Sequence, residues 1–169
     1  MQGSDAENLL SQFRSHRKLI MDLLRYLDQD QLAVKPLNSA GSFGKQFRHI
    51  LDIEKCYVES MYNGYLTFFR RNIDHSLEMD KARLIHELVS EDNKLEEIIE
   101  KLSIEKTHEK YIDCSEAVTY LGNANIKSSP VQVLSWMTEH EILHEGELVL
   151  YVRTAGLKFP PSWIIWGLR

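Results

Sequence analysis

The amino-acid sequence predicts an all-α protein, a four-helix bundle with a long crossover between its third and fourth helices. Two observations lead to this prediction. Neither glycine nor proline occurs between Gly64 and Gly122, which favours long helices in that part of the chain. Apolar residues also recur at intervals of three and four over four segments, as they do in amphipathic helices that bury one face. A length of 169 residues suits one domain, so we expect residues 1–169 to form a single helical bundle domain.

The first two helices are expected over residues 5–28 and 42–63, separated by a loop that contains Pro36 and Gly41. Ser42, with Gln46 close behind it, suits the N-terminal cap of the second helix. The predicted buried stripes are Leu9, Phe13, Ile20, Leu23, Leu24 and Leu27 in the first helix, and Phe43, Phe47, Ile50, Tyr57, Val58 and Met61 in the second.

The third and fourth helices are expected over residues 77–102 and 130–154. Ser129 is a good N-cap for the fourth helix, Pro130 suits its first position, and Gly156 follows its end. The connection 103–129 carries β-branched and aromatic residues around Gly122, which favours a short hairpin or an ordered crossover. The apolar tail after Gly156 is expected to pack on the bundle or on a partner subunit. The predicted stripe of the third helix is Leu84, Leu88, Leu95, Ile98, Ile99 and Leu102.

The composition argues against a nucleic-acid-binding, a membrane-spanning and a disulfide-rich secreted protein. The formal net charge of −5 argues against binding to nucleic acid or to an anionic membrane, because both need a basic surface. No apolar run reaches the length of about 18 residues that a membrane span requires, and the first residues do not have the pattern of a secretory signal. Two cysteines, Cys56 and Cys114, are too few for a disulfide framework. We therefore expect a cytoplasmic protein.

The clearest chemical signal is the run His140-Glu141-Ile142-Leu143-His144. Histidines four positions apart lie on one helical face about 6 Å apart, close enough to bind one metal ion. Both fall on the apolar face of the fourth helix, so they should point into the bundle. The alternative is two ordinary core histidines, each hydrogen-bonded to a polar partner. We favour the metal site, because two adjacent buried imidazoles must both stay neutral or share a partner.

The same run matches the H-E-x-x-H pattern of zinc proteases, but the chain has no His, Cys, Asp or Glu after Glu147 to supply their downstream ligand. Any third ligand must therefore come from upstream. His16 and His49 both lie on or beside the apolar faces of their helices, and the helical repeat alone does not show which of them is the third ligand. The remaining histidines are expected at the surface: His75, His86 and His108.

Two segments resemble a known family. The stretch Gly41-Ser42-Phe43-Gly44-Lys45-Gln46-Phe47-Arg48-His49-Ile50 is similar to the second-helix motif of the DinB/YfiT-like metalloenzymes, and His140–Leu148 resembles their fourth-helix H-x-x-x-H-x-G-[QE] motif. The resemblance implies a four-helix bundle with one divalent metal ion, zinc or nickel, held by His49, His140 and His144. It also implies a homodimer. Glu145 departs from the family, in which an arginine is frequent at this position.

Some members of that family are transferases or isomerases that use a low-molecular-weight thiol. The resemblance therefore suggests a metal-dependent hydrolase or thiol S-transferase with a small-molecule substrate. Glu141 either orients a ligand, acts as a base or is a carboxylate outside the site. Two alternatives stay open. One is a di-iron bundle built on Glu141/His144 and Glu105/His108. The other is a non-catalytic binding or stress-response bundle with a structural metal or none.

Overall fold

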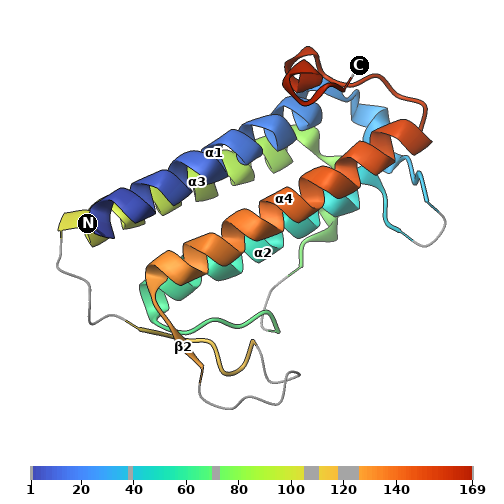
Figure 1. The fold of residues 1–169 in the computed structure, drawn as a ribbon. Coiled ribbons are helices and arrows are strands. Elements are labelled where there is room, and N and C mark those ends of the chain that lie inside the picture. The colour runs from blue at the N-terminus through green and yellow to red at the C-terminus, as the bar shows by residue number, and fades with distance from the viewer. Residues whose placement is uncertain (1, 38–39, 70–72, 105–110, 118–125, 169) are drawn as a thin grey trace.

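Four long helices form the bundle (Figure 1). A computed structural model of the chain describes residues 2–37, 40–69, 73–104, 111–117 and 126–168. α1 packs against both α3 and α4, and α2 packs against the same two helices. This arrangement confirms the predicted all-α bundle. The helices are α1 (Gln2–Tyr26), α2 (Phe43–Asn63), α3 (Lys81–Ile104) and α4 (Pro130–Thr154).

Serine caps fix the starts of α2 and α4 as the sequence predicts. Ser42 accepts a hydrogen bond from the backbone N–H of Lys45 at 3.2 Å. Ser129 accepts one from the N–H of Gln132 at 3.2 Å, and Pro130 occupies the first turn of α4. Gln46 has a different role from the predicted cap, because its side chain reaches across to α4.

Short 3₁₀ helices replace two of the predicted α-helical ends. α1 ends at Tyr26 and not at Asp28, because Asp28 caps the 3₁₀ helix η1 (Gln29–Ala33). The segment expected to begin the third helix forms a separate 3₁₀ helix, η2 (His75–Met79), and α3 starts only at Lys81. η2 packs so closely on α2 that a Cβ at Gly44 would lie 1.8 Å from the carbonyl oxygen of Glu78.

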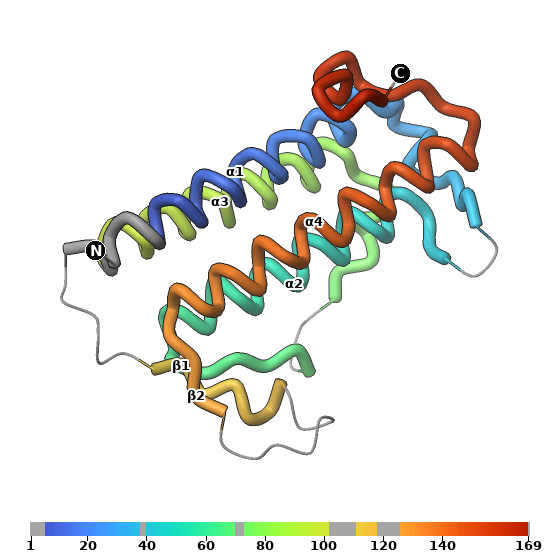
Figure 2. The backbone as a smooth tube through the Cα atoms, viewed as in Figure 1, coloured from blue at the N-terminus to red at the C-terminus, as the bar shows by residue number. Residues whose placement is uncertain are grey.

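The crossover between α3 and α4 contains a short antiparallel ribbon, in keeping with the first of the two forms expected for it, a hairpin or an ordered crossover. β1 (Ile112–Asp113) pairs with β2 (Lys127–Ser128) at the end of the bundle where α2 finishes and α4 begins (Figure 2). The chain leaving α2 joins this ribbon, since the N–H of Leu66 donates to the carbonyl of Asp113 at 2.7 Å. Residues 105–110 and 118–125 of the crossover lie outside the described residues.

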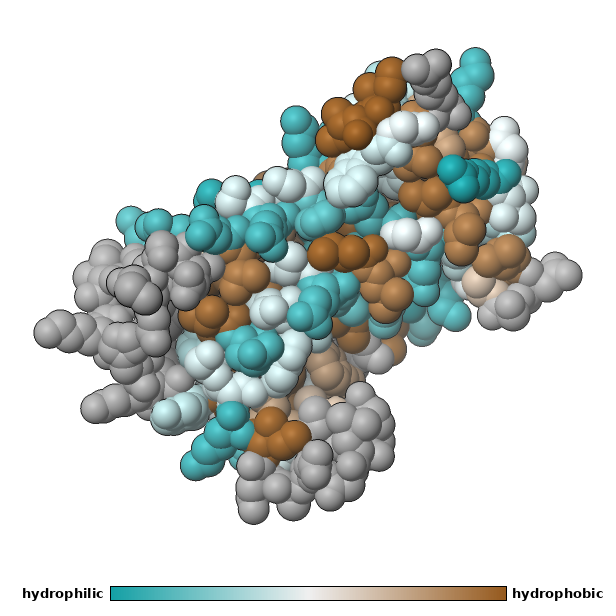
Figure 3. Space-filling view, in the orientation of Figure 1, coloured by the Kyte–Doolittle hydropathy of each residue, from teal (hydrophilic) through white to brown (hydrophobic). Residues whose placement is uncertain are grey.

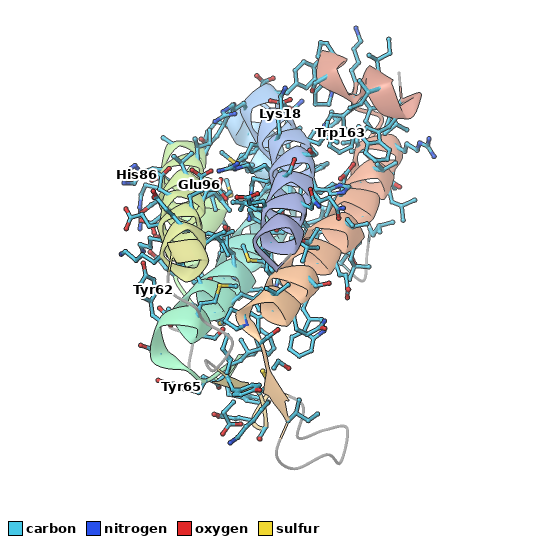
Figure 4. The ribbon with its side chains drawn as sticks, turned by 60° about the vertical axis from the view of Figure 1, so that its left-hand side comes forward. Lys18, Tyr62, Tyr65, His86, Glu96 and Trp163 are labelled. Atoms are coloured by element: carbon cyan, nitrogen blue, oxygen red, sulfur yellow. The ribbon has the colours of Figure 1, made fainter. Side chains whose placement is uncertain are left out.

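The C-terminal tail is anchored to the bundle by one tryptophan. Trp163 lies in the 3₁₀ helix η4 (Pro161–Trp166), is fully buried, and donates its indole N–H to the carbonyl of Leu19 at 2.9 Å (Figure 4). Phe159 stacks on its ring with centroids 5.6 Å apart. The tail therefore packs on the bundle, which is one of its two predicted places. Across the described ranges, no helix is long and apolar enough to cross a bilayer.

Buried polar residues divide the apolar core into two clusters. Along α4, Met137 belongs to one cluster and Leu148 to the other, with His140, Glu141 and His144 between them. Each other helix changes from one cluster to the other at the same level. We call this level the polar layer and define it by Arg17 of α1, His49 and Glu54 of α2, Asp92 of α3, and His140, Glu141 and His144 of α4.

Candidate metal centre

The structure brings three predicted ligands together within the polar layer. His49 projects from α2, and His140 and His144 project from α4; one nitrogen from each ring lies within 4.8 Å of the others. The Nε2 atoms of His140 and His144 are 2.9 Å apart. The ring of His49 lies 5.5 Å from that of His140 and 5.0 Å from that of His144, between centroids. We call these three residues the histidine cluster.

The donor set and its spacing fit a divalent metal ion. Two nitrogens bonded to one ion at 2.0–2.1 Å lie about 2.9 Å apart at a right angle and about 3.4 Å apart in a tetrahedron. The 2.9 Å between the Nε2 atoms of His140 and His144 is close to these values. Three imidazoles also form the protein ligand set of known catalytic zinc sites, which keep a further position open.

Two neighbouring side chains orient His144. His144 Nδ1 lies 2.7 Å from Glu147 Oε2, and the tautomer that donates its Nδ1–H to this carboxylate has its Nε2 lone pair directed at His140. The amide of Gln46 also contacts both His144 Nδ1 and Glu147 Oε2. Sequence reasoning missed both roles. The available signal was spacing, because Glu147 lies three residues after His144 and Gln46 lies three residues before His49, so each shares a helical face with a ligand.

Burial keeps His140 neutral, as a metal ligand must be. Burial, together with the smaller effects of the nearby His144 and His49 rings, lowers the pKa of His140 to about 3. The ring of Tyr57 lies edge-on to His140, with centroids 6.4 Å apart. His140 therefore needs no proton release to bind a cation at neutral pH.

Glu141 points away from the histidine cluster and towards α1. It is only 1% exposed, and its Oε1 accepts a hydrogen bond from Arg17 at 3.1 Å. The same Arg17 nitrogen donates to Glu54 Oε2 at 2.5 Å. On the far side, Arg17 Nε approaches Asp92 Oδ1 at 3.2 Å, in an ion pair that does not meet hydrogen-bond geometry. Of the three roles expected for Glu141, the structure therefore favours a carboxylate outside the histidine cluster, and this carboxylate is a fully buried partner of Arg17 and does not lie at the surface.

This carboxylate–arginine cluster (Arg17, Glu54, Asp92 and Glu141) holds three acids against one guanidinium. Burial raises the pKa of Glu54 well above its usual value and that of Glu141 to about 7, although Arg17 opposes both shifts. Burial also raises the pKa of Asp92. Burial alone would lower the pKa of Arg17, but the three carboxylates outweigh it and raise that pKa further. Protons are therefore held in this cluster at pH values where exposed carboxyls have lost them.

Comparison with known proteins places the chain in a family. A family model described as the DinB family matches residues 1–165. The chain belongs to the DinB family. It is 27% identical over 151 residues to the uncharacterized protein YjoA of Bacillus subtilis strain 168, covering 89% of this chain and 91% of that protein.

The fold of this DinB protein is also that of a solved relative. The crystal structure of the DinB-like protein YjoA from Bacillus subtilis matches with a TM-score of 0.67 and 23% sequence identity, covering 91% of this chain and 96% of that one. At this level of identity the likeness concerns the fold.

The other three histidines that the structure describes, His16, His75 and His86, are not part of the histidine cluster. His16, the other candidate for the third ligand, is half-buried, and its Nδ1 lies 2.7 Å from Glu145 Oε2. Glu145 is the position that departs from the family pattern, so here it pairs with α1. His75 and His86 are exposed, as predicted. His108 and Glu105 fall outside the described residues, and within the described ones the histidine cluster is the one group of three His, Cys, Asp or Glu suited to a metal ion.

Proposed function

We propose that this DinB-family chain binds one divalent metal ion through His49, His140 and His144 and uses it as a metal-dependent enzyme. The observation that carries the proposal is the convergence of three imidazole nitrogens within 4.8 Å, with the outer nitrogen of His144 bonded to Glu147. A carboxylate behind a ligating histidine is a common device that fixes the ring and raises its basicity. A pair of ordinary core histidines would not need a third imidazole facing them.

Zinc or nickel suits this donor set best. Imidazole is a favourable ligand for both ions, whereas calcium and magnesium prefer oxygen donors. When bound, such an ion would acidify a water or a thiol at its remaining position, which serves hydrolysis as well as thiol transfer. The protein side chains supply orientation. Glu147 and Gln46 hold His144, and burial keeps His140 unprotonated.

We propose a small-molecule substrate, with hydrolysis or S-transfer from a low-molecular-weight thiol as the reaction. Glu141 does not act as the base in this proposal, because its carboxylate is bonded to Arg17 on the other side of α4. Glu147 is the acid that contacts the cluster, and its role is to position His144.

The test is metal content measured by elemental mass spectrometry on untagged protein. We expect about one zinc or nickel ion per chain in the wild type and in His86→Ala, whose ring is exposed on α3. His49→Ala and His144→Ala should lose the ion while keeping the helical circular dichroism spectrum. Metal that survives both substitutions would overturn the proposed site.

An activity assay then distinguishes a metal-dependent enzyme from a bundle that the metal ion only stabilises. The metal-loaded protein is assayed with glutathione-type and smaller thiols plus an electrophile, and with ester and amide substrates. Activity lost in His49→Ala but kept in His86→Ala supports the enzyme. Full metal occupancy with no turnover, and a large loss of thermal stability on chelation, would favour a non-catalytic bundle with a structural metal.

A further inference from the structure

A cavity of about 220 Å³ lies between α1 and α3, along the edge of the bundle opposite to the contact between α2 and α4. α1 packs less closely on α3 than on α4, which leaves this space between the helices. The volume is that of about seven water molecules in the liquid, so the cavity can hold a small organic molecule. No residue of the histidine cluster lines it. We call it the α1–α3 cavity.

The walls of the α1–α3 cavity are apolar. Leu10, Phe13 and Met21 of α1 and Val89 and Leu95 of α3 form them. Four of these side chains are buried, whereas Val89 is 38% exposed, so the cavity reaches solvent beside it. Apolar walls with a small number of polar groups are typical of sites that bind small molecules, because the walls bury the hydrocarbon part of the ligand.

A buried guanidinium and a carboxylate lie together in the lining of the cavity. Arg17 is 4% exposed, and its Nη2 bonds to Glu54 and Glu141, but its Nη1 has no hydrogen-bond partner among the described residues. Asp92 Oδ1 is buried 3.2 Å from Arg17 Nε and accepts no hydrogen bond within the described part of the chain. A buried polar atom without a partner costs stability. The two residues therefore favour a ligand that brings both an acceptor and a donor.

The rim of the cavity on α1 is cationic. Lys18 and Arg25 are exposed and lie seven residues apart, hence on one face of α1. Neither forms an ion pair within the described ranges, whereas Arg14, the third basic residue of the rim, pairs with Glu96 at 2.8 Å. Hydrophilic residues follow α1 across the molecule in Figure 3, and Figure 4 labels Lys18 on α1 and Glu96 on α3, the two helices that border the cavity. This rim attracts a negatively charged group.

We propose that the α1–α3 cavity binds a free α-amino acid with an aliphatic side chain. The carboxylate of the ligand accepts hydrogen bonds from Arg17 Nη1 and from Lys18, its ammonium group donates to Asp92, and its hydrocarbon chain packs on Met21 and Val89. A simple carboxylate would leave Asp92 Oδ1 without a donor, and a simple amine would leave Arg17 Nη1 without an acceptor. This site goes beyond the proposed function and is independent of it, because the two sites share no residue.

Titration with L-leucine, followed by calorimetry and by ligand-observed NMR, tests the class of ligand. We expect a dissociation constant of about 0.1–1 mM, because a ligand of this size has few atoms with which to bind. Isocaproate, which lacks the amino group, and isoamylamine, which lacks the carboxylate, should each bind at least about tenfold more weakly. Binding of either analogue as tightly as leucine would overturn the assignment to an amino acid.

Two substitutions on α3 test the location. Val89→Trp fills the cavity from an exposed position and should abolish leucine binding, whereas His86→Trp, exposed and outside the lining, should leave it unchanged. Asp92→Asn keeps the shape of the side chain but removes its charge, and it should weaken binding at least about tenfold. Its control is Glu97→Gln, an exposed acid of the same helix. Leucine that does not bind to the wild type, or that binds equally to Val89→Trp, would overturn the site and leave a cavity that holds water only.

Amino acids also chelate zinc and nickel, so the titration is repeated with His49→Ala. That variant keeps every residue of the α1–α3 cavity, and leucine should bind to it as it does to the wild type. Binding that is lost in His49→Ala would place the amino acid on the metal ion and overturn the cavity site. Metal content alone decides the proposed metal centre, so failure of one proposal is distinguishable from failure of the other.

Discussion

Arg17→Met removes the single positive charge of the carboxylate–arginine cluster and leaves a side chain of similar length. We expect it to lower the free energy of unfolding by about 3–5 kcal/mol, the usual cost of leaving a buried charge without its partner. Arg17 is 4% exposed, and both Glu54 and Glu141 are 1% exposed, so water does not replace the lost contacts. A loss of this size is a large share of the about 5–15 kcal/mol that stabilises a typical domain.

The matched control is Arg14→Met, one turn earlier on the same helix. Arg14 also pairs with a carboxylate, at 2.8 Å from Glu96 of α3, but both side chains are about half exposed (Figure 4 labels Glu96). An exposed pair contributes about 0–1 kcal/mol, because water and salt screen it. Urea unfolding of the metal-free proteins at pH 7.5 measures both changes, with the slope against urea expected to stay constant.

The cost of Arg17→Met should also depend on pH. Burial raises the pKa of Glu141 from 4.5 to about 7, so the folded protein holds a proton that the unfolded chain has released between these values. The contribution of Glu141 to the free energy of unfolding therefore falls as the pH rises from 4.5 to 7. Without Arg17 the pKa rises further, so the variant should lose more stability at pH 8 than at pH 5. Equal costs for Arg17→Met and Arg14→Met, or a cost that is the same at both pH values, would refute this reasoning.

Three further substitutions have defined outcomes. Glu147→Gln keeps the shape of the side chain but weakens its hold on His144, so zinc affinity measured by competition with a chromogenic chelator should fall about 10–100-fold while folding is unchanged. Gly44→Ala should destabilise by about 1–3 kcal/mol or more in urea unfolding, because its Cβ would lie 1.8 Å from a backbone oxygen; Gly41→Ala, which meets only the flexible Lys45 side chain, should cost much less. Trp163→Ala should cost about 3–5 kcal/mol and expose the tail to limited proteolysis.

The helix boundaries that sequence reasoning placed well are those with a specific chemical cap. α2 and α4 start after Ser42 and Ser129, and α4 ends where Gly156 allows the chain to turn. The start of α3 was wrong because Leu77 is buried whether it lies in an α-helix or in η2. Apolar spacing of three or four residues does not distinguish the two.

The histidine cluster shows what the residues alone could and could not establish. The spacing of His140 and His144 predicted one shared face from the sequence. The choice between His49 and His16 as third ligand depends on which helix packs against which side of α4. The helical repeat shows which residues share a face of one helix but not how the helices pack, and only the family resemblance pointed to His49. For the same reason the partner of Glu141 was missed, since it faces α1 and not α2. The structure places together the three histidines that the family resemblance implies as ligands. Metal binding itself stays a prediction.

The polar layer also explains why the bundle keeps charges that a purely apolar core would do without. Replacing a buried ion cluster by well-packed apolar residues is often neutral or stabilising, so three carboxylates around Arg17 are not explained by stability. Arg17 instead bonds to α2 at Glu54 and to α4 at Glu141, and these are the two helices that carry the histidines. Sliding one helix along the other would break a buried charge-assisted hydrogen bond as well as separate His49 from His140. The cluster thus couples the register of the two helices to the geometry of the candidate metal centre.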